Sequence, residues 1–291
     1  MVFADKWYSL LSTIAATPDT HKRRRNRLTI FRTAFTLPSM SVTPIVASLL
    51  FFAGFFGGLI DSIAGGGGLI TLPVLLAIGL PPHQALGTNK FQSTFGSITS
   101  SYNYVKHGGI SLRAAIWGIV FTIIGAAAGA QVVQMVNADI LHWIIPFLLL
   151  AILVYTIFSP DLGKHDSRPR WSQFVFYLVF GLGIGFYDGF FGPGTGSFWP
   201  VAMVLLLGLN LVKATGYTKV MNFTSNIVSL IVFFIGGNIV FLPGLCMGLG
   251  EIIGAKIGTT LVIKKGVKFI RPVFITVVLA TTLKLFYDNL K

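Results

Sequence analysis

The sequence predicts an all-α polytopic membrane protein built from two homologous repeats. Of its 291 residues, 54% are hydrophobic and only 11% are charged, whereas soluble domains carry about 25% charged residues. Stretches without any Asp, Glu, Lys or Arg cover 33–60, 62–89, 114–138, 140–160, 189–212 and 220–250. Corresponding residues also recur in the two halves. Despite a net charge of +13, this composition excludes a soluble enzyme or a nucleic-acid-binding domain.

The charge-free stretches indicate helices rather than strands. About 20 apolar residues in a helix cross a hydrocarbon core of about 30 Å. A membrane β-barrel would instead show segments of roughly ten residues that alternate between apolar and polar. The run 148–154 is apolar at every position. Helical crossings follow.

Residues 1–42 are predicted to form a basic cytoplasmic tail. They hold seven of the 22 basic residues, at 6, 22–25, 27 and 32. Cytoplasmic segments next to membrane helices carry such an excess of Lys and Arg, and they contact anionic lipid. Met40 is an alternative start, which would make 1–39 an extension.

The first repeat, 43–158, contains five apolar segments, at 44–62, 69–80, 84–105, 114–136 and 140–158. The second of them is short, since twelve helical residues reach only about 18 Å. Pro73 is expected to interrupt it further. We interpret this segment, and 197–209 with Pro200 in the second repeat, as half-helices or re-entrant segments.

A polar linker at 159–171 precedes the second repeat, 172–291. Aligning Asp61 with Asp188 places Pro73 on Pro200, and a slip of two residues then places Lys90 on Lys219. Internal duplication of this kind is common in transporters. We predict about eight full transmembrane helices plus two short broken or re-entrant segments. Ten crossings is the alternative, if the short segments cross.

Two loops led by aspartate are candidates for a binding site, because an ionised side chain inside a bilayer costs several kcal/mol and needs a partner or water. Asp61 precedes four glycines at 65–68, and Asp188 precedes the glycine-rich run 189–196. Glycines end a helix, and the next helix would then present bare N–H groups to an anion. The alternative is that glycines only permit close packing, as we expect at 125–129 and 250–254.

A second polar cluster follows each short segment, at 87–93 and 216–226. On a helix, spacings of three and four residues place these polar side chains on one face, where charge and several donors suit a small tetrahedral anion. Interhelical hydrogen bonding, or lysines that snorkel to the interface, is the alternative. The candidate substrate-binding residues are Asn89, Lys90, Ser93, Lys219, Asn222, Asn226, Gly66, Gly67, Gly194 and Thr195, with Asp61 and Asp188 assigned to proton coupling or ion pairing.

Glu251 occurs in the second half only, where the first half has Ala126. It carries a coupling proton or pairs with a neighbouring lysine, and we favour pairing. The single cysteine, Cys246, and five scattered histidines lack the spacing of metal ligands. There is no nucleophile elbow and no intramembrane His–carboxylate cluster. We therefore expect no metal, no cofactor and no enzymatic activity.

The motifs at 58–68, 85–90, 185–197, 213–215 and 222–226 resemble the TauE/SafE sulfite exporter family, also called the 4-toluene sulfonate uptake permease family. The resemblance is closest to its YfcA-like branch, and it covers about 41–288. It implies a secondary transporter of the bacterial inner membrane for sulfur-containing anions such as sulfite or organosulfonates.

We therefore expect a multi-pass inner-membrane transporter, with a cytoplasmic N-terminus, that moves a small sulfur-containing anion. Coupling to protons and alternating access between the two repeats are part of this expectation. The expected partners are the anion and membrane lipid, without nucleic acid, and a homo-oligomer is compatible with the sequence. An anion channel is the first alternative function, and a membrane-embedded enzyme is the second.

Overall fold

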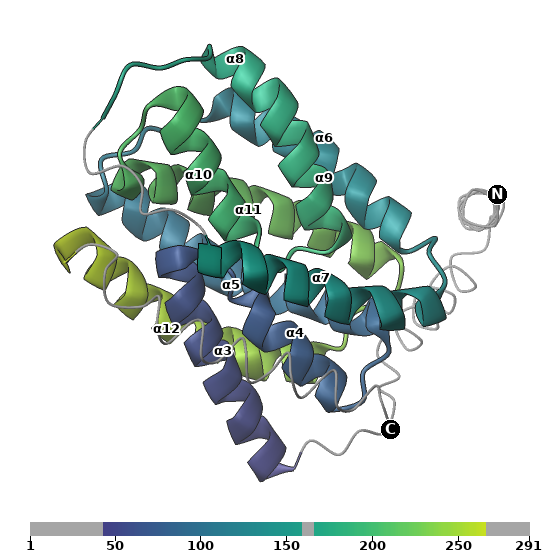
Figure 1. The fold of residues 1–291 in the computed structure, drawn as a ribbon. Coiled ribbons are helices and arrows are strands. Elements are labelled where there is room, and N and C mark those ends of the chain that lie inside the picture. The colour runs from purple at the N-terminus through teal and green to yellow at the C-terminus, as the bar shows by residue number, and fades with distance from the viewer. Residues whose placement is uncertain (1–42, 159–165, 266–291) are drawn as a thin grey trace, which may run out of the picture. The chain divides into compact units, whose positions relative to one another are not determined.

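The structure is a computed structural model, which describes residues 43–158 and 166–265. All regular structure in these ranges is helical (Figure 1). The helices are α3 (Pro44–Ala64), α4 (Gly68–Ala77), α5 (Pro82–His107), α6 (Ile116–Val133), α7 (Ala138–Phe158), α8 (Gln173–Phe176), η1 (Tyr177–Gly181), α9 (Leu182–Phe190), α10 (Thr195–Leu207), α11 (Leu211–Ile235) and α12 (Phe241–Lys265). The predicted basic tail, the start of the linker and the fifth segment of the second repeat lie outside the described residues.

Among the residues that the structure describes, five helical stretches are long and apolar enough to cross a membrane, so the chain is a multi-pass membrane protein. They are Pro44–Ala64, Ile116–Val133, Gln173–Phe190, Leu211–Ile235 and Phe241–Lys264. Helix α5 is not among them. Its 26 residues reach about 39 Å, but many of its buried side chains are polar. The totals of eight or ten crossings remain predictions.

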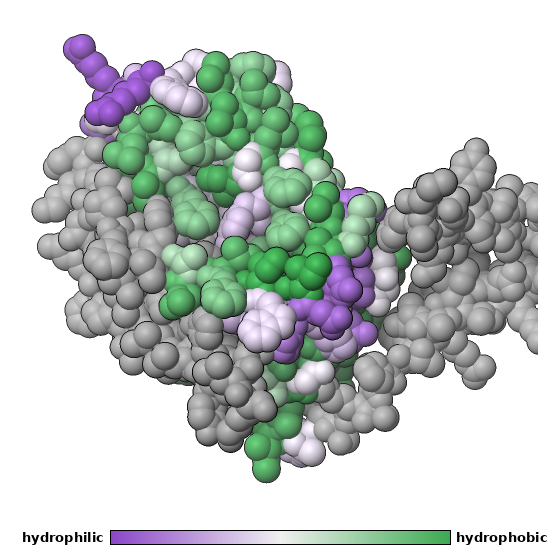
Figure 2. All heavy atoms as spheres, turned by 45° about the vertical axis from the view of Figure 1, so that its right-hand side comes forward, coloured by the Kyte–Doolittle hydropathy of each residue, from purple (hydrophilic) through white to green (hydrophobic). Residues whose placement is uncertain are grey.

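The outer faces of the spanning helices are apolar. On α12 the exposed large side chains follow one another at helical spacing, at Leu242, Leu245, Leu249 and Ile253. Hydrophobic residues dominate the coloured face in Figure 2. An exposed apolar stripe of this kind is costly in water and suits contact with lipid.

Helices from the two predicted halves interlock. Helix α3 packs most extensively on α12, and α6 packs on α9 in the same way. Helix α5 lies against both α11 and α12. Each of these contacts joins a helix from before the linker to one from after it, so the predicted halves share their packing surfaces.

Glycines allow these helices to touch backbone to backbone. A Cβ at Gly125 or Gly129 of α6 would collide with the main chain of α9, and one at Gly250 or Gly254 of α12 would collide with that of α3. Small residues permit this approach between membrane helices. The packing role predicted for 125–129 and 250–254 is therefore confirmed.

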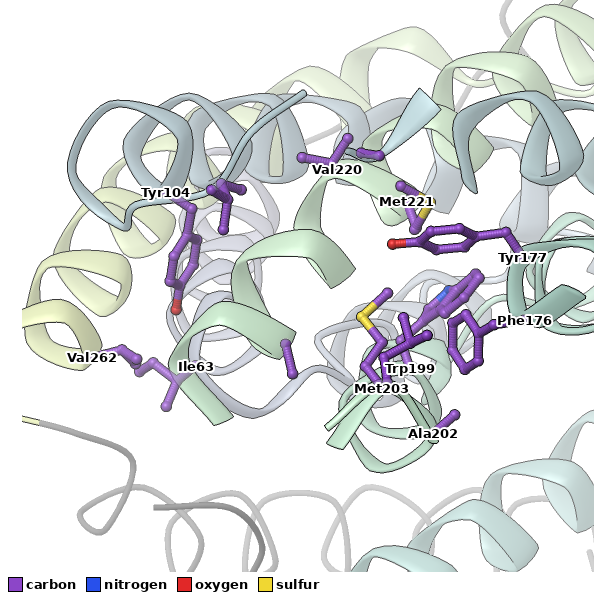
Figure 3. Packing of buried hydrophobic residues seen from close by; sticks show 14 residues of the cluster. Ile63, Tyr104, Phe176, Tyr177, Trp199, Ala202, Met203, Val220, Met221 and Val262 are labelled. Carbon is purple, nitrogen blue, oxygen red and sulfur yellow. The ribbon is translucent and has the colours of Figure 1, made fainter. Parts of the chain in front are cut away.

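An aromatic cluster holds α10 in place. Phe176 and Tyr177, from α8 and η1, face Trp199 of α10, with ring centroids 6.3 and 6.4 Å from it. Met203 and Met221 complete this side of the core (Figure 3). This packing fixes the position of α10, whose first turn lines the candidate site described below.

The two short segments are continuous helices, which corrects the expectation that proline would interrupt them. Pro73 lies inside the ten-residue α4, and Pro200 lies inside the thirteen-residue α10. A proline removes one backbone hydrogen bond and crowds the preceding turn. Both prolines are buried, and tertiary packing around them stabilises each helix despite this loss. Both helices are still too short to cross a 30 Å core, at about 15 and 20 Å.

The end of the linker is tied to the turn between α10 and α11. The Asp166 carboxylate accepts hydrogen bonds from the Asn210 backbone N–H at 2.7 Å and from Lys213 Nζ at 2.6 Å. The hydrogen bond from Lys213, followed by that from the Asn210 N–H, holds the pKa of Asp166 below its usual range.

Candidate functional site

A buried ion pair links α5 to α9. Lys90 Nζ lies 2.5 Å from Asp188 Oδ1, and the two side chains are 2% and 5% exposed. The other Asp188 oxygen accepts a hydrogen bond from the Ser225 hydroxyl. Lys90 also donates to Asn226 Oδ1 at 3.4 Å. Such charge-assisted hydrogen bonds are what make a buried pair tolerable.

A second pair links α11 to α3. Lys219 Nζ lies 3.1 Å from Asp61 Oδ2 and also donates to the Asp61 backbone carbonyl. Lys219 is fully buried, whereas the Asp61 side chain is 23% exposed. The two pairs cross over, because each joins an acid from one predicted half to the lysine of the other. Each half therefore needs the other to neutralise its buried charges.

At one loop, the backbone N–H groups that were expected to be free for an anion are already hydrogen-bonded. Gly66 and Gly67 donate to Asp61 Oδ1 at 3.2 and 3.4 Å. Asp61 lies in the last turn of α3, just before the glycine loop that separates α3 from α4. Its carboxylate therefore caps the start of α4. An anion at this loop would have to compete with Asp61.

The two glycine loops meet face to face. Gly65 and Gly196 are so close that a Cβ on Gly196 would stand 2.5 Å from the Gly65 Cα. Gly65, Gly192 and Gly194 have positive φ values of 74°, 96° and 84°, a region that other residues rarely adopt. The starts of α4 and α10 therefore converge on one point.

A polar pocket of about 390 Å³, including its open mouth, lies at this point. Ten of the twelve candidate residues line it, and the other two, Gly67 and Lys219, reach it through their bonds to Asp61. The lining is Asp61, Gly66, Gly68, Asn89, Lys90, Ser93, Asp188, Gly192, Gly194, Thr195, Gly196, Asn222, Asn226 and Glu251.

Side-chain amides surround the charged groups. Asn89 Oδ1 accepts from the Thr71 hydroxyl at 2.6 Å and from Gln92 Nε2 at 3.0 Å. These two donors hold the amide of Asn89 in one orientation. Asn222 Oδ1 is buried without a hydrogen-bond partner among the described residues. These amides, beside two ammonium groups, provide a polar lining for a small ligand.

Four residues of the lining lie outside the candidate set predicted from the sequence: Gly68, Gly192, Gly196 and Glu251. The glycines belong to motifs already singled out, so the close approach of the loops was the missing information. Glu251 is 2% exposed, and its Oε2 accepts from the Gly96 N–H at 3.2 Å. The preferred pairing with a lysine is wrong for the part of the chain that the structure describes, where Glu251 forms no ion pair.

Known proteins are similar to this chain over most of its length. The family described as "Sulfite exporter TauE/SafE" matches residues 50–285. "Probable membrane transporter protein YfcA" of Escherichia coli K12 is 43% identical over 248 residues, covering 85% of this chain and 92% of the relative. A "Probable membrane transporter protein" of Haemophilus influenzae is 44% identical over 242 residues, covering 83% and 95%. No solved structure matches.

Proposed function

The chain belongs to the sulfite exporter TauE/SafE family, and from this premise we propose that it is a secondary transporter for a small sulfur-containing anion, sulfite or an organosulfonate. It acts in the bacterial inner membrane, with its basic N-terminus in the cytoplasm. Two arguments support this placement: the similar proteins are bacterial membrane transporters, and the positive-inside rule assigns the basic end.

The observation that carries the proposal is the pair of buried lysines at one small polar pocket. Lys90 and Lys219 each hold a carboxylate, which is the kind of group that a sulfite or sulfonate head resembles in charge and in acceptor oxygens. The amides of Asn89, Asn222 and Asn226 supply further donors around it. An anion binds here by replacing a carboxylate as the partner of a lysine.

This exchange couples the anion to a proton. A bound anion adds one negative charge to the buried pocket, and a buried charge that no cation balances costs several kcal/mol. Uptake of a proton by the carboxyl groups of the pocket removes that cost. The affinity for the anion therefore increases when the proton is bound, and the affinity for the proton increases when the anion is bound.

Alternating access follows from movement around the fixed site, as in other transporters with internal repeats. The interlocked packing favours two moving bodies, one containing α3 with α12 and the other containing α6 with α9. Each body takes helices from both predicted halves. Asp61 lies on α3 in one body and Asp188 lies on α9 in the other, so the exchange of their lysine partners with the anion is linked to the movement.

A thermal-shift screen of detergent-purified protein tests the anion site, because a ligand that binds the folded state raises its stability by mass action. We expect sulfite or an organosulfonate to raise the melting temperature of the wild type. Lys90→Ala and Lys219→Ala should lose this increase, measured from each variant's own unliganded value. Lys213→Ala, which removes an ion-paired lysine outside the pocket, should keep it. An unchanged increase in both pocket variants would reject the site.

A further inference from the structure

Glu251 is a buried carboxyl group that the lysine exchange does not use. It lines the pocket from α12 with 2% of its surface exposed. Its Oε2 accepts one backbone hydrogen bond, from Gly96 at 3.2 Å. Within residues 43–158 and 166–265 it has no ion-pair partner, so nothing described here neutralises a charge on it.

Glycines on α3 and α5 make the slot that holds this side chain. A Cβ at Gly96 would stand 2.5 Å from Glu251 Oε2, and one at Gly57 would stand 3.7 Å from Oε1. Gly58 packs directly on the Glu251 backbone. The absence of side chains at three neighbouring positions gives the carboxyl group a defined place at the pocket wall.

Packing alone does not require a carboxyl group here. Helix α6 carries Ala126 at the position that matches Glu251. Ala126 is fully buried, and its backbone packs against Gly189 of α9. The backbone of Glu251 packs against Gly58 of α3 in the same way. The same kind of helix contact therefore forms around alanine, and the carboxyl group on α12 must have another use.

The charges of the pocket point to that use. Three carboxyl groups, those of Asp61, Asp188 and Glu251, face two ammonium groups, so full ionisation leaves 2 − 3 = −1. Lys90 on α5 is held by Asp188 on α9, and Lys219 on α11 is held by Asp61 on α3. Asp61 is close enough to repel a negative charge on Glu251, and Lys219 attracts it. An unpaired buried carboxylate costs several kcal/mol, and a proton removes that cost.

We propose that Glu251 is the binding site of the coupling proton, while Asp61 and Asp188 serve as the ion-pair partners of the lysines. This inference rests on the proposed function, since it names the carrier of the proton in that transport cycle. An incoming anion brings negative charge next to Glu251, so it binds to the protonated form. Anion and proton then bind as a unit.

Infrared titration of the unliganded protein tests the proton site without any transport assay. We expect a carboxylic-acid C=O band that persists above about pH 6, where exposed carboxyl groups are already ionised, and that disappears as the pH is raised further. Glu251→Gln should lack the band in this pH range. Asp139→Asn, which makes the same change at an exposed position on α7, should retain the band. A C=O band that remains in this pH range in Glu251→Gln, or no such band in the wild type, would overturn the proposal.

Binding of methanesulfonate tests the linkage. This probe stays a monoanion across the neutral range, so any pH dependence belongs to the protein. Above the titration midpoint of Glu251, the affinity of the wild type should fall about tenfold per pH unit, because one proton binds with each anion. In Glu251→Gln the affinity should change less than about twofold over the same range, whereas Glu251→Asp should keep a pH dependence. An unaltered dependence in Glu251→Gln would contradict the proposal.

The two experiments separate this inference from the proposed function. If methanesulfonate and sulfite bind at no pH, the anion site fails, while the infrared titration still decides whether Glu251 holds a proton. If the anions bind with the lysine dependence described above but Glu251→Gln leaves the infrared band in place, the anion site stands and the proton assignment falls.

Discussion

At the scale of the residue, the lysines of the pocket owe their position to the acids across from them. Lys90 and Lys219 are almost fully buried, and an ammonium group in that setting is stable only with a partner. Each partner comes from another helix, so a single substitution breaks a contact between elements as well as a charge pair.

Lys90→Ala should destabilise the unliganded protein strongly, because it leaves Asp188 buried without its cation. Removal of one partner of a buried pair costs about 3–5 kcal/mol. The double variant Lys90→Ala with Asp188→Ala should recover part of this loss, since no unpaired charge remains. Melting temperatures of the purified variants give the comparison.

Lys213→Ala is the matched control for this loss. Its ion pair with Asp166 is short, at 2.6 Å, but the two side chains are 40% and 48% exposed, and such surface pairs contribute about 0–1 kcal/mol. Equal destabilisation by Lys90→Ala and Lys213→Ala would contradict the claim that breaking the buried pair costs more free energy than breaking the exposed one.

At the scale of the element, the close approach of the two glycine loops determines the geometry of the pocket. The starts of α4 and α10 come together at Gly65 and Gly196 without any side chain between them. Both helices are short, so their first turns, and not a full crossing, carry their contribution to the site.

Gly196→Ala should lower the melting temperature and abolish anion binding. Its Cβ would stand 2.5 Å from the Gly65 Cα, and relieving that overlap requires α10 to move, at a cost of about 1–3 kcal/mol. Gly183→Ala on α9 is the control, since nothing lies within 4 Å of its Cβ and alanine favours a helix by up to about 1 kcal/mol. Equal melting temperatures and equal anion binding in the two variants would contradict the importance of this close approach.

The tie between the linker and α11 should weaken in acid. Because the pKa of Asp166 in the folded protein is below its ordinary value, the tie contributes fully above the unfolded pKa of about 4 and is lost as the pH falls through the lower folded value. Asp166→Asn should therefore lower the melting temperature at neutral pH, by an amount that shrinks as the pH falls below about 4. A constant difference at all pH values would contradict this assignment.

At the scale of the whole molecule, the reciprocal packing makes the two predicted halves dependent on each other. Helix α3 finds its main partner in α12, and α9 finds its main partner in α6. The buried charge pairs follow the same crossing pattern. We therefore expect the chain to fold as one cooperative unit.

Splitting the chain within the linker tests this expectation. Either half expressed alone should fail to give a monodisperse, protease-resistant protein, because its packing faces and its unpaired buried charges are left open. Co-expressed halves should associate and recover the anion-dependent rise in melting temperature. A stable, folded single half would contradict the interlocked arrangement.

The local features were predictable from the sequence, and the contacts between distant segments were not. Hydropathy and helical spacing placed the short segments and the polar faces near Asn89 and Asn222. The partner of each charge required tertiary information, since Lys90 and Asp188 are 98 residues apart and Lys219 and Asp61 are 158 apart. For the same reason, the absence of a lysine partner for Glu251 among the described residues could not be read from the sequence. The capping of α4 by Asp61 spans only five and six residues, but it depends on the positive φ values of Gly65 and Gly66, which spacing does not reveal.

Transport of radiolabelled sulfite into proteoliposomes tests the central claim most directly. We predict that an imposed pH gradient drives accumulation by the wild type and by Lys213→Ala, and that Lys90→Ala and Lys219→Ala, reconstituted to the same density, lose it. Protein-free liposomes correct for sulfur dioxide that crosses lipid unaided. Equal accumulation in the pocket variants would contradict the anion site, and gradient-independent flux without accumulation would show a channel instead of a transporter.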